Sequence, residues 1–147
     1  MNPWHLVRRF VGSVTAAPLT RAERREVNEV LTAAEQSLFA RLGKADQRHA
    51  LIVLRRFDAL VAAAPVAARR AALLHDIGKV EVRLGTVMRV VATLVGPRGA
   101  VFRRYHAHEA RGLELLGEAG SDSLTLGILR GTADAPLVAA LRRADDV

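Results

Sequence analysis

The chain has 147 residues, of which half are apolar and only 4% aromatic, and it contains no cysteine. A helical core built mainly from Ala, Leu and Val is expected, and the lack of cysteine excludes disulfides and thiolate metal sites. The net charge of +7 favours anionic partners, nucleic acid included. No apolar run reaches the roughly 20 residues of a membrane span and no signal peptide is evident, so a cytoplasmic location is predicted.

Helical periodicity runs along the whole chain. It predicts helices over residues 2–14, 20–42, 46–64, 66–76, 85–94, 100–118, 121–131 and 135–146. Thr20 and Glu23 form a capping box at the start of the second helix, while Asp46 and Ser121 are expected to cap the third and the seventh. Strand alternation and long linkers are absent from the sequence pattern. We therefore expect an all-α fold, a compact single-domain bundle of about six to eight helices.

The strongest functional signal is the run His75-Asp76-Ile77-Gly78-Lys79, which follows an apolar helical segment. A neutral imidazole and a carboxylate on successive residues can both bind one divalent metal. The alternative is a helix-ending pair in which Asp76 satisfies backbone groups, but an unpaired carboxylate in an apolar stretch is costly. Lys79 is one of only two lysines in a chain that otherwise uses arginine, and its compact ammonium suits a phosphate.

Residues far from this run could complete the site. His49 shares a helix face with Ile52, and Asp145 shares one with Leu141, so both are expected to point into a bundle core. A lone His49 would more often be a hydrogen-bonded core histidine, and Asp145 could be a solvated carboxylate. His108 could be a ligand, a general acid, a substrate contact or a structural residue.

This combination resembles the HD superfamily of metal-dependent phosphohydrolases, whose pattern is an early His, the His-Asp doublet and a late Asp. The residues that match this pattern are His49, His75, Asp76 and Asp145. The segment His108–Leu116 is similar to the HxxxGxxLL pattern of HD-GYP-like members. The resemblance covers residues 46–147 as an HD core, which leaves residues 1–45 as N-terminal helices of the same domain.

The resemblance implies that these four residues hold one divalent ion, which the donor types restrict to Mn, Fe, Ni, Co, Mg or Zn. Water activated by that ion would hydrolyse a nucleotide or another small phosphoester. Asp76, Lys79 and His108 are then the expected catalytic residues. Lys79, Arg104 and Arg111 are the expected substrate contacts, although the plainer interpretation of both arginines is surface exposure.

HD-GYP members also carry a later His-His-Glu and a GYP signature, whereas the corresponding residues 129–134 contain no His, so one metal rather than two is expected. A catalytically weak or inactive HD module that binds a nucleotide or a protein partner in signalling stays open. A nucleic-acid binder rests on charge alone, because the six Arg-Arg doublets lie on different segments without interleaved aromatics. Trp4, Leu6 and Phe10 could form a membrane-surface or homodimer face, although packing on the core is the plainer interpretation.

Overall fold

A computed structural model describes residues 16–80 and 100–146, with the backbone alone for residues 100–108. Within these ranges all regular structure is helical, which confirms the predicted all-α class. The elements are α2 (Arg21–Val30), α3 (Ala33–Phe39), α4 (Lys44–Leu60), α5 (Val66–Leu74), the 3₁₀ helix η1 (Ile77–Val80), α7 (Ala100–Glu118), α8 (Ser123–Arg130) and α9 (Ala135–Asp145). The helices expected over residues 2–14 and 85–94 lie outside the described residues.

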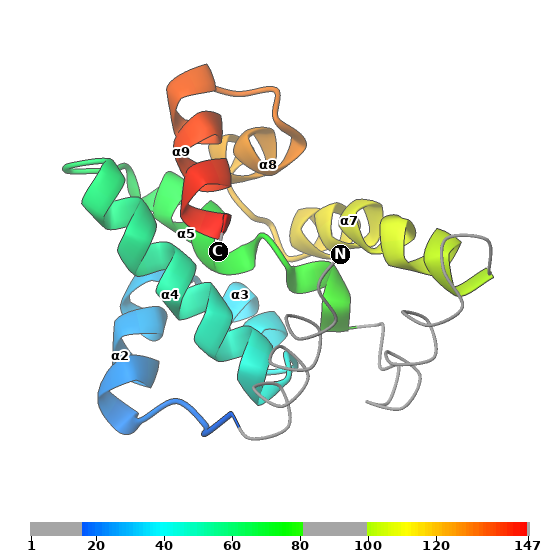
Figure 1. Cartoon of the computed structure of the whole chain (residues 1–147), viewed down its shortest axis with the longest axis horizontal. Helices are drawn as coiled ribbons and strands as arrows, with labels where there is room; N and C mark the ends of the chain where they lie inside the picture. Colours follow the sequence, from blue (N-terminus) through cyan, green and yellow to red (C-terminus); the bar gives the residue numbers. More distant parts are fainter. Residues whose placement is uncertain (1–15, 81–99, 147) are drawn as a thin grey trace, which may run out of the picture.

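The core forms around α4 and α5. α4 packs against α5 and α9, α5 packs against α8, and α7 packs against η1 (Figure 1). The largest fully buried apolar side chains are Val27, Leu51, Val53, Leu54, Phe57, Leu73, Leu74, Ile77 and Leu116. Small side chains at Ala68, Ala71 and Ala72 are also fully buried, and they allow α5 to lie close to its neighbours. This is the aliphatic core that the low aromatic content predicts.

The N-terminal half differs from the expectation at one break. The predicted capping box is confirmed, because Thr20 Oγ1 accepts the Glu23 N–H and the Glu23 carboxylate accepts the Thr20 N–H, at 3.2 and 2.8 Å. The prediction of one continuous helix from there was wrong. Leu31 is extended (φ −84°, ψ 146°), and Thr32 begins α3 with a second capping box that it shares with Glu35.

Two predicted caps were also wrong. α4 begins after Gly43, and Asp46 lies inside its first turn without capping it. At the start of α8 the Asp122 carboxylate accepts the Leu124 N–H at 2.8 Å, so Asp122 is the N-cap and Ser121 is not. Both displaced side chains instead make contacts with distant parts of the chain.

Ser121 contacts a carboxylate that is completely buried. The Ser121 hydroxyl donates to Glu35 Oε1 at 2.7 Å, and the Thr32 N–H donates to Glu35 Oε2 at 2.9 Å. Arg70 Nε lies 3.5 Å from the same Oε2. Each oxygen therefore has a partner, which is the condition for burying a carboxylate at tolerable cost. These contacts join α3, α5 and the connection between α7 and α8.

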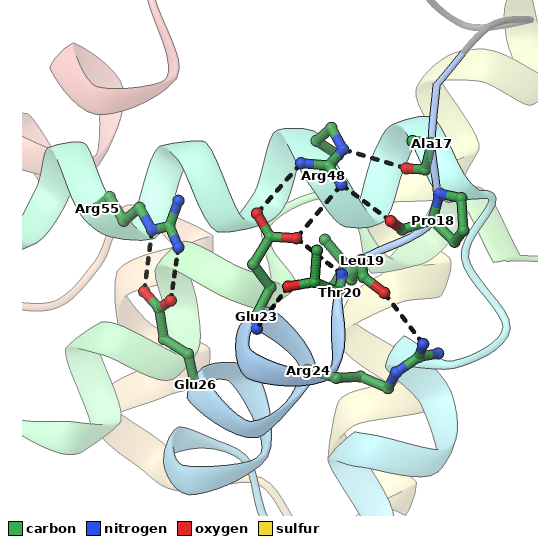
Figure 2. A network of polar contacts seen from close by, with 9 residues as sticks. All are labelled: Ala17, Pro18, Leu19, Thr20, Glu23, Arg24, Glu26, Arg48 and Arg55. Atoms are coloured by element: carbon green, nitrogen blue, oxygen red, sulfur yellow. Dashed lines mark hydrogen bonds and ion pairs between the residues drawn. The ribbon is translucent and has the colours of Figure 1, made fainter.

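Two arginines of α4 connect it to α2, as Figure 2 shows. Arg48 donates to two backbone carbonyls in the segment before α2, at 3.1 and 3.0 Å, and to the Glu23 carboxylate at 3.2 and 3.3 Å. Arg55 binds Glu26 through two hydrogen bonds of 3.1 and 2.7 Å. Part of the basic charge is thus used inside the fold, in bidentate pairs that favour arginine over lysine.

Residues 129–134, which lack the HD-GYP histidines, form the end of α8 and the turn into α9. Gly131 ends α8 in the left-handed conformation (φ 73°), which favours glycine. A Cβ at Gly127 would lie 2.9 Å from the Cβ of Ala133, so the turn is closely packed. Within the described ranges no single helix combines the length and apolar composition of a membrane crossing, although α8 and α9, bent by 64°, meet those criteria as a pair.

Candidate metal centre

Three parts of the fold bring together four residues that the sequence pattern singled out. His49 comes from α4, and Asp145 comes from the last turn of α9. His75 and Asp76 form the turn between α5 and η1. Because α4 packs against both α5 and α9, these side chains converge where the three helices meet.

The distances within this cluster suit a shared ion. His49 Nε2 lies 3.0 Å from Asp145 Oδ1, and His75 Nε2 lies 3.3 Å from the same oxygen and 3.6 Å from Asp76 Oδ2. Ligand atoms of His49, His75 and Asp76 all lie within 4.8 Å of one another. Atoms bound about 2.0–2.2 Å from one ion are themselves about 3.0–3.5 Å apart, so little movement is needed to bind one.

His75 gives the clearest indication of a metal ligand. Its Nδ1 donates to the carbonyl of Ala72 at 2.9 Å, which leaves Nε2 as the lone-pair nitrogen of the neutral ring. That Nε2 is buried and, among the described residues, has no hydrogen-bond partner. Asp145 Oδ1 lies 3.3 Å from it, close enough for an ion pair when the ring is protonated. A buried polar atom left unsatisfied costs about 1–3 kcal/mol, and a bound metal ion would remove that cost.

The electrostatics of the cluster favour a bound cation. Burial lowers the pKa of His75, but the carboxylates of Asp145 and Asp76 outweigh burial and raise it above the ordinary value. Burial raises the pKa of Asp76, yet the charges of His75 and Lys79 hold it below the ordinary value. The contact with His75 outweighs burial and holds the pKa of Asp145 far below its usual range. Both carboxylates are therefore ionised at neutral pH.

Lys79, on η1, contacts the same oxygen of Asp76 that lies near His75. Its Nζ donates to Asp76 Oδ2 at 2.5 Å and lies 3.7 Å from Asp46 Oδ1. The sequence pattern missed Asp46 as a site residue. The signal that could have identified it is its position one turn before His49, because residues three apart share a helix face.

Gly112, the glycine of the HxxxGxxLL segment, lets α7 approach this turn. A Cβ at Gly112 would lie 2.9 Å from the backbone nitrogen of Gly78 and 3.2 Å from Ile77 Cγ2. Backbone atoms this close cannot be displaced without moving η1, which carries Lys79. In this chain the glycine of the segment therefore has a packing role beside the site.

The structure says less about the other predicted site residues, which are Arg104, His108 and Arg111. The side chains of Arg104 and His108 lie outside the described residues, so their roles stay predictions. Arg111 donates to Glu114 on its own helix at 2.8 Å and lies 3.9 Å from Glu118. Its predicted substrate contact is untested by this pairing.

The close approach at Gly112 leads to a stability prediction. Gly112→Ala is expected to destabilise the fold by about 1–3 kcal/mol, because the added methyl group overpacks against the backbone of Gly78. Gly117→Ala on the same helix is the matched control: apart from its neighbours on α7, no atom of the described residues lies within 4 Å of its Cβ position. This control should be neutral or stabilising by up to about 1 kcal/mol. Urea unfolding compares the two, and equal stabilities would show that the close approach is not required.

Comparison of the chain with protein-family models, with curated proteins and with solved structures gives no match. The chemistry of the site therefore follows from its own side chains. Two imidazole nitrogens and two carboxylates converge, and an ammonium group lies beside them. This donor set suits a divalent ion such as Mn, Fe, Co, Ni or Zn, and it offers no soft ligand for copper(I).

Proposed function

We propose that this cluster binds one divalent metal ion and that the protein is a metal-dependent phosphohydrolase acting on a nucleotide or another small phosphoester. The observation that carries the proposal is the buried Nε2 of His75, which makes no hydrogen bond to the part of the chain that the structure describes and lies within 3.6 Å of carboxylate oxygens from Asp76 and Asp145. His49 adds a second imidazole from α4. Mn, Fe, Ni, Co, Mg and Zn all fit this set of ligands.

The ion would supply Lewis acidity, which acidifies water and polarises a phosphoryl oxygen. The residues of the chain supply the rest. Asp76 lies between His75 and Lys79, where its carboxylate can accept a hydrogen bond from the attacking water and orient it. Lys79 offsets the negative charge that develops on the phosphoryl oxygens. His108 is assigned the protonation of the leaving group.

A second candidate function uses the same cluster without turnover: a module that binds a nucleotide or a partner protein and signals its occupancy. The pairing of Lys79 with Asp76 and Asp46 favours it, because a lysine already held by two carboxylates has less charge to offer a transition state.

Metal analysis combined with a substrate panel separates these functions. Protein loaded with Mn²⁺ or Ni²⁺ should retain about one ion per chain and hydrolyse at least one member of a panel of nucleotides and phosphodiesters. Retention of metal without turnover on any member would favour the signalling module. Protein that retains no ion after loading with Mn²⁺, Ni²⁺, Fe²⁺ or Zn²⁺ would contradict both functions.

The affinity for metal should fall as the pH decreases. Asp76 and Asp145 stay ionised because their pKa values are lowered, whereas the pKa of His75 is raised. A protonated Nε2 cannot bind metal, so affinity is full above the pKa of His75 and decreases below it. The decrease should begin above the ordinary histidine value of about 6.5. Calorimetric titration with Mn²⁺ between about pH 5 and 8 measures this, and an unchanged affinity would contradict ligation by histidine.

A further inference from the structure

We propose that Lys79 is the built-in second cation of this centre, and that Asp46 is the positioning residue that holds it there. The inference rests on the proposed metal site. It explains why the chain would bind one ion where a two-metal hydrolase binds two: the place next to the first ion is taken by an ammonium group.

The first observation is that one oxygen atom faces both cation positions. Asp76 Oδ2 lies 3.6 Å from His75 Nε2, on the side of the proposed ion, and 2.5 Å from Lys79 Nζ. In a site with two cations, a carboxylate between them neutralises both at once. Asp76 has that position here, with the ammonium of Lys79 as the second positive charge.

The second observation is the carboxylate on the far side of Lys79. Asp46 Oδ1 lies 3.7 Å from Nζ, and the Asp46 and Lys79 side chains are only 14% and 22% exposed. A partly buried pair is screened less by solvent than a surface pair. Asp46 comes from α4 and Asp76 from the turn after α5, so two chain segments place carboxylates around one cation. Without that cation their negative charges would repel each other.

Lys79 can replace only part of what a second metal ion does. In two-metal sites, ions about 3.5–4 Å apart stabilise the attacking and the leaving oxygens together. An ammonium group supplies charge and hydrogen bonds to phosphoryl oxygens, but it does not acidify a second water. The two carboxylates that hold it are themselves good ligands for Mn²⁺ or Mg²⁺. Removing the lysine charge should therefore open a second metal position.

The test is metal stoichiometry in Lys79→Met, which keeps an unbranched side chain one atom shorter than lysine and removes its charge. At saturating Mn²⁺, bound metal should rise from about one ion per chain in the wild type to about two, with a spin-coupled pair visible by electron paramagnetic resonance. Lys44→Met removes the other lysine of the chain, which is exposed at the start of α4, and should leave one ion. The double variant Lys79→Met/Asp46→Asn should return to one ion.

Each outcome decides the proposal. One ion in both the wild type and Lys79→Met would overturn the inference and leave the proposed metal site intact. No ion in the wild type would instead contradict the proposed function. Two ions in the double variant would show that Asp46 has no part in the second position. If Lys79→Met does not fold, as judged by circular dichroism, Lys79→Ala replaces it in the test. The same rise from one bound ion to two is expected for this variant.

Discussion

Replacing His75 by alanine is expected to abolish the thermal stabilisation that Mn²⁺ gives to the wild-type protein. A ligand that binds only the folded state stabilises it by about 2.7 kcal/mol at one hundred times its Kd. For a chain of this size that corresponds to several degrees in Tm. His75 supplies the buried nitrogen of the cluster, and without it the remaining ligands hold metal weakly. Differential scanning calorimetry with and without Mn²⁺ measures the shift.

Without metal, the same substitution should cost about 1–3 kcal/mol, because it removes the Nδ1 hydrogen bond to Ala72 and the contacts of Nε2 with the carboxylates of Asp145 and Asp76, and leaves a small cavity. Adjacent carboxylates supply a matched control. Asp145 contacts both histidines, so Asp145→Ala should reduce the Mn²⁺ shift, while Asp146→Ala should keep it. A full Mn²⁺ shift in His75→Ala would contradict the proposed centre.

The helix boundaries that the sequence pattern predicted well are those marked by local chemistry. The capping box of Thr20 and Glu23 begins α2, and Gly131 ends α8. The break before Thr32 was missed because the surrounding residues continue a helical pattern. The capping box of Thr32 and Glu35 is visible in the sequence, whereas the burial of Glu35 against the hydroxyl of Ser121, from a distant segment, is seen only in the structure.

The candidate site was likewise predicted only in part. The histidines and Asp145 were grouped from the resemblance to the HD pattern together with helix faces, and the structure brings them together. The burial of these side chains was not predicted correctly. Asp145 was expected to point into the core, but its side chain is 48% exposed. Asp46 was missed because its contact with Lys79 depends on how α4 packs beside η1. The spacing of Asp46 and His49 along α4 could have placed Asp46 near the site, but it carries no information about the contact with Lys79.

At Mn²⁺ concentrations that fill only the first metal position, Lys79→Ala is expected to lower turnover by roughly 10²–10³-fold. A loss of this size is typical when one group that stabilises transition-state charge is removed. The first ion should be retained under these conditions, because its histidine and aspartate ligands are untouched. Lys79→Arg should recover only part of the loss, since a planar guanidinium does not replace a compact ammonium. Steady-state kinetics with parallel metal analysis measures both effects.

Raising the Mn²⁺ concentration adds a second arm to this experiment. If a second ion enters beside Asp46 and Asp76 in Lys79→Ala, it should restore part of the turnover, because it would stabilise the same phosphoryl oxygens. Lys44→Ala should behave as the wild type at every concentration. Wild-type turnover in Lys79→Ala with one ion bound would contradict a phosphate role for Lys79. If the wild-type protein shows no turnover at all and Lys79→Ala binds nucleotide more weakly, Lys79 belongs to the signalling module. A charge that only holds a ligand changes the affinity for that ligand alone.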